Sequence, residues 1–466
     1  MNREILTFAY LFLFVFAAFI GYFIWFQVGQ SQTVVNNSYN KRVEAQVKRT
    51  VRGRILSNDG TVLAETRTDG DGTEKRYYPY GEDLAHLTGY VDRGKTGVEA
   101  LANFYLLDSH QSAWVKFTND IFGEKNIGDD VRTTIDLDLQ LAAAEAMDGR
   151  KGAVVVLEVS TGKILAMVSN PAYDPNIISE QWEDLTAETN KEANLLNRAA
   201  QGLYPPGSTF KLVTLLEFIR EYPYTWQNFT YDCQGVNEEE DYTIRCYDGT
   251  AHGHLTLEQA LVESCNGAFA AIGQMLDPEK YTAACEALGF NHKLSFELAN
   301  SAASFSLEEG SNAWNIARTA IGQGKTQITP LLNAMIAAAV ANDGVMMQPY
   351  VLEAVLSGEK ELEHFEPVVL DTVMTEEEAS VIRQMMRAVV RDGTMKSLKT
   401  DRYEAYGKTG TAEYITGSDL THAWFTGFAG EGEECIAVSV IVEGAGTGNQ
   451  KAVPVAAAVF DEYFMD

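Results

Sequence analysis

The sequence predicts an α+β protein of two or three domains that follows one N-terminal membrane-spanning helix. Its 466 residues, 46% of them hydrophobic, are enough for more than one packed core. Residues 5–28 form an uncharged apolar run. Farther along, hairpin patterns such as those at 52–64 and 153–168 are interspersed with helical patterns such as the one at 375–391.

The apolar run from Ile5 to Val28 has 24 residues. At about 1.5 Å per residue, a helix of this length crosses a hydrocarbon core of about 30 Å. It is longer than the apolar part of a signal peptide, and no Ala-x-Ala cleavage site follows it, so we interpret it as an uncleaved signal anchor. Arg3 favours a cytoplasmic N-terminus at 1–4, although Lys41 and Arg42 beyond the span weaken that signal.

The chain is strongly acidic, with 65 Asp and Glu against 36 Lys and Arg and a net charge of −29. Such a surface repels phosphates, which argues against a nucleic-acid partner. Five cysteines are too few for a disulfide-framework protein.

Patterns before residue 149 predict a stalk and a small mixed domain. The stalk covers 30–50. Two strands within 52–64 are joined by the turn Asn58-Asp59-Gly60, and 67–76 forms a hairpin tip. The remaining predicted elements are a helix at 97–107, a strand at 131–134 and a helix at 136–147.

Near Gly149 the pattern changes, and we place a domain boundary there. Residues 153–159 and 164–168 predict two strands around the turn Ser160–Lys163. The predicted helices that follow are 182–197, 258–276, 281–288, 329–341, 375–391 and 453–463. The predicted strands are 407–414, 423–429 and 436–443.

One stretch, Pro205-Pro206-Gly207-Ser208-Thr209-Phe210-Lys211, carries a candidate nucleophile. The apolar run that follows predicts a helix with Ser208 in its first turn. Residues three apart share a helix face, so Ser208 and Lys211 point the same way. A lysine whose pKa is lowered by burial can take the proton of a serine hydroxyl. By itself, however, Ser-x-x-Lys occurs often by chance.

Two later segments give this stretch its weight. Glu263-Ser264-Cys265-Asn266-Gly267 offers a hydroxyl and an amide, and Gly407-Lys408-Thr409-Gly410-Thr411-Ala412 offers a cation and two hydroxyls beside glycines. Taken alone, the first of these segments is better interpreted as an ordinary polar turn beside a helix, and the alternative for the second is a Gly-rich turn beside a β-strand. In order, Ser264 follows Ser208 by 56 residues and Lys408 follows Ser264 by 144.

The three segments together resemble the Ser-x-x-Lys, Ser-x-Asn and Lys-Thr-Gly motifs of penicillin-binding proteins and serine β-lactamases. Arg52-Gly-Arg-Ile, Thr96-Gly97-Val98-Glu99 and His422-Ala-Trp-Phe-Thr-Gly-Phe428 extend the likeness to the class B penicillin-binding proteins. This family has a transpeptidase domain with a central antiparallel five-stranded sheet flanked by helices, a helical subdomain, and a smaller α/β pedestal domain.

The resemblance implies a role for each motif residue. Ser208 would attack the D-alanyl-D-alanine bond of a peptidoglycan stem peptide, with Lys211 as the base and Ser264 as a proton relay. Asn266 would orient the peptide. Lys408, Thr409, Gly410 and Thr411 would hold its carboxylate, and the N–H groups of Ser208 and Thr411 would form the oxyanion hole. Penicillins would acylate the same serine. The resemblance implies no cofactor and no metal ligand in this site.

The 120 residues from 29 to 148 are too few for the glycosyltransferase domain of class A members. We therefore expect a cytoplasmic tip at 1–4, the anchor at 5–28, a stalk and pedestal at 29–148, and an extracytoplasmic transpeptidase domain at 149–466. Such proteins act on stem peptides or lipid-linked precursors beside a glycan polymerase of the SEDS family. The sequence does not distinguish elongation, division and spore wall synthesis.

Three other functions fit parts of the sequence. A β-lactamase of this fold needs no pedestal, and a D,D-carboxypeptidase differs only in the acceptor of the acyl group. A non-catalytic activator of a glycan polymerase would not need all three motifs intact.

Four potential metal ligands lie close together in the sequence: Cys233, Cys246, His254 and Cys265. Three thiolates and an imidazole suit tetrahedral zinc. A Cys233–Cys246 disulfide is an alternative in an oxidising compartment, and independent thiols are another. The spacing of these residues in the sequence does not distinguish a zinc site from a disulfide or from independent thiols. We expect Cys285 and Cys435 to be buried apolar residues.

Overall fold

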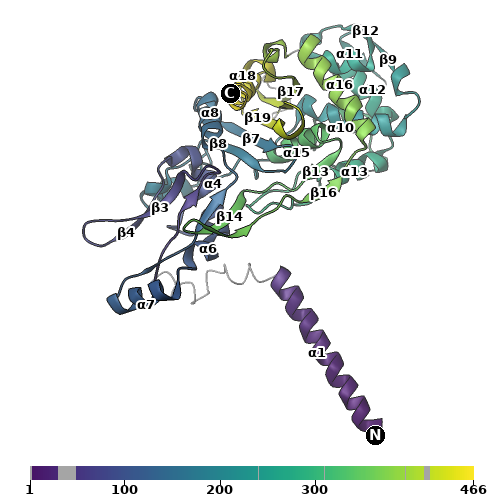
Figure 1. Cartoon of the computed structure of the whole chain (residues 1–466). Helices are drawn as coiled ribbons and strands as arrows, with labels where there is room; N and C mark the ends of the chain where they lie inside the picture. The colour runs from purple at the N-terminus through teal and green to yellow at the C-terminus, as the bar shows by residue number, and fades with distance from the viewer. Residues whose placement is uncertain are drawn as a thin grey trace.

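The computed structural model describes residues 3–29, 49–239, 241–308, 310–393, 395–413 and 420–465. Most of the predicted stalk, at 30–48, and Tyr414 of a predicted strand lie outside these residues. Helix α1 (Arg3–Gly29) contains the predicted span, and its stretch Ile5–Trp25 is long and apolar enough to cross a membrane (Figure 1).

A five-stranded antiparallel sheet forms the centre of the C-terminal part, as predicted. Its order is β17 (Ala405–Glu413), β18 (Thr421–Ala429), β19 (Ile436–Val442), β7 (Gly152–Glu158) and β8 (Ile164–Asn170). The three inner strands are almost wholly buried because helices cover both faces of the sheet. Strand β17 forms one edge.

The helices that cover this sheet are α8 (Leu137–Met147), α18 (Val453–Tyr463) and α15 (Pro330–Ala341). On β18, Thr426 donates to the Asn333 carbonyl of α15, with 3.0 Å between oxygens. The ring of the next residue toward the N-terminus, Phe425, contacts Phe460 of α18. Neighbouring residues on a strand point to opposite faces, so α15 and α18 cover opposite faces of the sheet.

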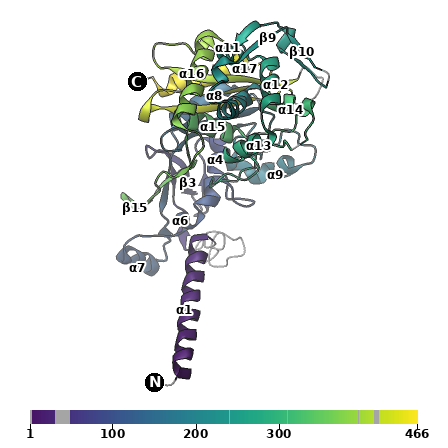
Figure 2. The same ribbon diagram turned by 90° about the vertical axis from the view of Figure 1, so that its right-hand side faces the viewer.

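A helical subdomain lies beside β17 (Figures 1 and 2). Its helices are η3 (Gly207–Phe210), α10 (Lys211–Glu221), α11 (Leu257–Val262), α12 (Asn266–Met275), α13 (Pro278–Ala287), α14 (Ala313–Ala320) and α16 (Glu376–Asp392). It also carries two small antiparallel pairs, β9 (Thr230–Cys233) with β12 (Gly253–Thr256) and β10 (Val236–Glu238) with β11 (Thr243–Arg245).

The N-terminal part is built on a six-stranded sheet in the order β15 (Lys360–His364), β14 (Leu352–Ser357), β6 (Asp130–Thr133), β2 (Ile55–Leu56), β3 (Val62–Thr68) and β4 (Glu74–Tyr77). Its short helices are η1 (Gly81–Leu84), α4 (Ala85–Thr88), α5 (Gly97–Leu101), α6 (Asn103–Leu107) and α7 (Ala113–Phe122). Strands β14 and β15 come from beyond residue 149, so this sheet joins two distant parts of the sequence. The domain limits stay a prediction.

A buried ion cluster holds this pedestal together. The Glu99 carboxylate is fully buried and accepts from Arg52 Nε and Arg76 Nε, each at 2.6 Å. Arg76 also donates to the Gly53 carbonyl at 2.7 Å. The motif residues Arg52 and Glu99 therefore meet across 47 residues of sequence.

Short elements and connections complete the fold. They are β1 (Thr50–Val51), β5 (Asn126–Ile127), η2 (Pro175–Ile177), α9 (Ile178–Thr186), η4 (Trp226–Asn228), η5 (Tyr247–Gly249), β13 (Val345–Met347), β16 (Val369–Thr372), η6 (Lys396–Leu398), η7 (Gly432–Glu434) and α17 (Gly448–Lys451). Sequence patterns did not predict α7, α14 or strands β9 to β16.

Three helix predictions were wrong in part. The predicted helix 97–107 is interrupted at Ala102, between α5 and α6. The predicted helix 182–197 ends with α9 at Thr186, since Asn190 caps its own turn and the buried Arg198 takes the carbonyls of Glu192 and Ala193. The predicted helix 258–276 breaks into α11 and α12 at Ser264, whose φ is +53°. That break lies in the second motif and forms part of the candidate site.

Candidate active site

Ser208 sits on the tight turn η3, directly before α10. Gly207 has φ +55°, and a Cβ added there would lie 2.7 Å from the Thr411 carbonyl oxygen of β17. A side chain at Gly207 would thus push the turn off the strand edge. The Gly207 N–H also donates to the Gly322 carbonyl at 2.9 Å, which fixes the turn from the other side.

Ser208 lies on the 3-10 helix η3, and α10 begins only at Lys211, so the predicted first helical turn is a 3-10 turn. That the two side chains share one face stays a prediction. Ser208 is half-buried, whereas Lys211 is fully buried. Within the described part of the chain, no hydrogen bond joins the two side chains. Apo active sites often show such long contacts, which tighten when substrate binds.

The Lys211 amine is held by three oxygen atoms of the second motif. Nζ donates to the Ser264 carbonyl at 2.7 Å and to Asn266 Oδ1 at 2.7 Å, and it lies 3.2 Å from Ser264 Oγ. A neutral amine has two N–H donors and one lone pair. The two short contacts use both donors and leave the lone pair free to accept a proton.

Ser264 lies between two lysines. Its Oγ is 3.2 Å from Lys211 Nζ and 2.9 Å from Lys408 Nζ. A hydroxyl has one donor and two acceptor positions, so it can donate to a neutral amine while accepting from a charged one. The positive φ of Ser264 is an unfavourable conformation for a residue with a side chain, and it turns this hydroxyl between the two amines.

Burial changes the protonation of both lysines. It lowers the pKa of Lys211 to about 8, and negative charge on Cys265 and Cys246 would oppose that shift. Burial, and then the nearby Lys211 cation, lower the pKa of Lys408 well below its usual range. A lysine with a pKa near 8 is a suitable general base close to neutral pH.

Asn266 begins α12, and its amide is oriented by two contacts. Nδ2 donates to the Arg245 carbonyl at 2.9 Å, while Oδ1 accepts from Lys211. The sequence did not predict the role of the Arg245 carbonyl, because a backbone oxygen on another strand has no signature in the sequence.

The third motif lies on β17, the edge strand beside η3. Lys408 is fully buried, Thr409 is nearly so, and Thr411 is half-buried. Thr409 and Thr411 are two residues apart and share one face of the strand. At Gly410, a Cβ would lie 2.9 Å from the Pro206 carbonyl oxygen, so the strand and the Ser208 turn touch through backbone.

Two further residues hold the Ser208 turn: Trp424, which lies in the stretch 422–428 that resembles the family, and Gly322, which no motif indicated. The buried Trp424 donates Nε1 to the Pro205 carbonyl at 3.0 Å. A Cβ at Gly322 would lie 2.1 Å from the Gly207 carbonyl oxygen, so only glycine allows this approach.

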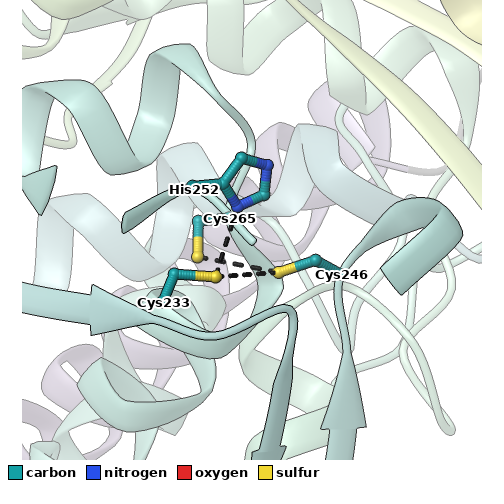
Figure 3. Close-up of side chains that lie close together, drawn as sticks. All are labelled: Cys233, Cys246, His252 and Cys265. Atoms are coloured by element: carbon teal, nitrogen blue, oxygen red, sulfur yellow. Dashed lines mark hydrogen bonds between the residues drawn. The ribbon is translucent and has the colours of Figure 1, made fainter. Parts of the chain in front are cut away.

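The predicted Cys–His set needs one correction. Cys233, Cys246 and Cys265 do converge, but the histidine with them is His252 (Figure 3). His254 is exposed on β12, where it pairs with Asp232, the residue before Cys233, and so lies on the opposite face from Cys233; its Nδ1 lies 2.8 Å from Asp232 Oδ1. Cys285 and Cys435 are buried, as predicted.

Comparisons with known proteins match most of the chain. The model of the penicillin binding protein transpeptidase domain matches residues 152–463. The model of the penicillin binding protein A dimerisation domain matches residues 52–131.

Relatives and solved structures agree with these matches. Peptidoglycan D,D-transpeptidase PbpA of Mycolicibacterium smegmatis is 30% identical and covers 90% of both chains. The D,D-transpeptidase domain of a peptidoglycan glycosyltransferase from Eggerthella lenta is 31% identical, with TM-score 0.78 over 89% of this chain and 98% of that one. Penicillin-binding protein A from M. tuberculosis, as an imipenem acyl-enzyme complex, is 28% identical, with TM-score 0.80 over 90% of this chain and 100% of that one.

Proposed function

This chain belongs to the penicillin-binding protein transpeptidase family, class B, and we propose that it cross-links peptidoglycan by serine acyl transfer, with Ser208 as the nucleophile. The observation that carries the assignment of residues is the Ser264 hydroxyl between two buried lysine amines, one of which, Lys211, begins the helix that directly follows the Ser208 turn.

Acylation begins when neutral Lys211 takes the proton of Ser208 Oγ, which attacks the carbonyl carbon between two D-alanines of a stem peptide. The oxyanion that forms is stabilised by the N–H groups of Ser208 and Thr411. Losing one such donor typically costs about 3 kcal/mol of transition-state stabilisation.

Collapse of this intermediate breaks the amide bond. The D-alanine amine takes a proton that Lys211 delivers through Ser264, and D-alanine leaves. The amine of a second stem peptide then attacks the acyl-enzyme, gives up its proton along the same path and restores Ser208. Asn266 orients the peptide, while Lys408, Thr409 and Thr411, with backbone at Gly410, hold the carboxylate. A penicillin takes the place of the donor peptide and acylates Ser208.

The chain is anchored by α1, and we place the catalytic domain outside the cytoplasm, where its substrate is. A membrane-embedded glycan polymerase of the SEDS family is the partner we propose, in contact with the span and the pedestal. Co-purification of the two proteins from membranes, with and without residues 49–148, tests that contact.

The first experiment is labelling by a fluorescent penicillin. The wild type is expected to form a stable adduct, and Ser208→Ala is expected to form none. The circular dichroism and melting temperature of this variant should match those of the wild type, since Ser208 is half-buried and its hydroxyl makes no hydrogen bond to the described residues. An adduct on Ser208→Ala would refute the nucleophile.

A second assay separates transpeptidation from simple hydrolysis. Polymerised lipid-linked glycan with a labelled acceptor amine is expected to yield cross-linked dimers. Release of D-alanine without dimers would identify a carboxypeptidase, and rapid loss of the penicillin adduct would identify a β-lactamase.

A further inference from the structure

The subdomain beside the active site carries a second cluster of reactive side chains, formed by Cys233, Cys246, His252 and Cys265 (Figure 3). One ligand atom from each of the four lies within 4.8 Å of every other. Cys233 ends β9, Cys246 follows β11, His252 precedes β12 and Cys265 caps α12. Four separate segments thus converge on one point.

The distances fit a tetrahedral metal site. Cys246 Sγ lies 3.6 Å from Cys233 Sγ and 3.7 Å from Cys265 Sγ, and His252 Nδ1 lies 3.3 Å from Cys233 Sγ. With Zn–S bonds of about 2.3 Å and a Zn–N bond of about 2.0 Å, a tetrahedron has S···S edges of about 3.8 Å and S···N edges of about 3.5 Å. A disulfide instead requires sulfurs about 2.05 Å apart.

The surroundings favour thiolates. The three cysteines are buried, with exposed fractions of 2%, 5% and 0% for Cys233, Cys246 and Cys265. Backbone N–H groups of Gly235 and Ala268 donate to Cys233 Sγ and Cys265 Sγ, each at 3.4 Å. Such N–H···S contacts, one of them from the first turn of α12, stabilise negative sulfur.

The hairpins that carry the ligands have almost no core of their own. Within β9, β10, β11 and β12, most residues are exposed or half-buried. Small segments of this kind are commonly held by a metal or a disulfide. A metal at the four side chains would cross-link both hairpins to α12.

From these observations we propose that Cys233, Cys246, His252 and Cys265 bind one Zn²⁺ ion. The three thiols release three protons on binding and supply three sulfur ligands, and His252 supplies Nδ1. Soft sulfur ligands and tetrahedral geometry select zinc over magnesium or calcium.

The metal also fixes the second catalytic motif, a consequence that rests on the proposed function. Cys265 stands between Ser264 and Asn266 in the sequence. Cys246 follows Arg245, whose carbonyl holds the Asn266 amide. The ion therefore ties together both ends of the Asn266–Arg245 contact, and it does so without touching substrate.

Metal content tests the site. Full-length protein in detergent, purified under reducing conditions, is expected to contain one zinc per chain by mass spectrometry of the metal. Replacement by Co²⁺ should give the visible d–d bands of a tetrahedral site and sulfur-to-cobalt charge transfer. His252→Ala and Cys246→Ser should lose both signals.

Matched variants serve as controls. His254→Ala removes the nearby exposed imidazole, and Cys285→Ser removes a buried thiol elsewhere; both should keep metal and spectrum. If Cys246→Ser does not fold, His252→Ala decides, since His252 is only half-buried. Metal-free wild type with five free thiols, a disulfide within the cluster, or a metal-replete His252→Ala protein would overturn the proposal.

Labelling with fluorescent penicillin tests the consequence separately. Chelator-treated wild type should be acylated more slowly and recover with Zn²⁺, whereas His254→Ala should respond as the wild type does. Unchanged acylation after proven metal loss would refute the link to Ser264 and Asn266. A zinc-loaded protein that is never acylated would refute the proposed function and leave the metal site standing.

Discussion

The pedestal and the active site both bury charged side chains, but the buried charge is paired with opposite charges in the pedestal and hydrogen-bonds to uncharged groups in the active site. Glu99 of the pedestal meets Arg52 and Arg76 at 2.6 Å. Lys211 and Lys408 of the active site are equally buried, yet their hydrogen-bond partners among the described residues are uncharged oxygens.

This difference in pairing gives the two kinds of buried group different protonation behaviour. Burial raises the pKa of Glu99, but the attraction of Arg52 and Arg76 outweighs it, so the net shift is downward and the carboxylate stays ionised. For Lys211 nothing outweighs burial, and its pKa falls to about 8. A paired charge stabilises the fold, whereas an unpaired buried lysine has a lowered pKa and loses its proton closer to neutral pH.

The largest effect should follow from removing the active-site amine. Lys211→Met keeps an unbranched side chain of similar length and deletes the base. We expect the rate of acylation by a fluorescent penicillin to fall by about 10²–10⁴-fold, the usual contribution of a general base. The free energy of unfolding should not fall, because an unpaired buried cation is replaced by an apolar group. A variant that kept more than about a tenth of the rate would contradict the role of Lys211.

Removing the pedestal charge should lower the stability of the fold and leave the acylation rate unchanged. Glu99→Gln leaves Arg52 and Arg76 buried without a counter-charge, which typically costs about 3–5 kcal/mol. Urea unfolding measures this loss, while the acylation rate of the folded fraction should stay at the wild-type value. Glu74→Gln, in a partly exposed pair with Lys125, is the matched control and should change little.

The Glu99 variant also has a pH signature. Since the folded-state pKa of Glu99 is lowered, its stabilisation is present above the usual glutamate pKa and is lost as pH falls through the folded value. Glu99→Gln should therefore show a shallower acid limb in a plot of stability against pH. An acid limb identical to the wild type, or slower acylation by well-folded protein, would show that the cluster is not purely structural.

The smallest effect concerns the junction of the two parts. Glu353 of β14 meets Lys163 Nζ at 2.7 Å and Arg132 Nε at 2.8 Å. These side chains are partly exposed, so Lys163→Met should cost about 1 kcal/mol or less in thermal unfolding, with unchanged acylation. A larger loss of stability would mean that this junction is essential to the fold.

Several features were predictable from the sequence because they depend on local patterns. Short apolar runs predicted the strands of the central sheet, and the three motifs predicted the residues around Lys211. The meeting of Arg52 with Glu99, and the place of β14 in the pedestal sheet, depend on tertiary contacts between distant segments. The break at Ser264 was hidden because the surrounding residues, Glu258 to Leu276, favour one continuous helix. His254 pairs with Asp232 and faces away from Cys233, whereas His252 lies just before β12, where the positive φ of Gly253 interrupts the strand alternation. A short polar strand does not encode this register clearly.

The pH dependence of acylation tests the central claim most directly, that an unpaired buried Lys211 is the base for Ser208. Only the neutral amine accepts the Ser208 proton, so the second-order rate constant for penicillin acylation should rise about tenfold per pH unit and level off above a midpoint near 8. The Lys211→Met protein should lack this rise. A wild-type rate that is flat from about pH 6 to about pH 9, across the range in which this lysine titrates, would contradict the assignment.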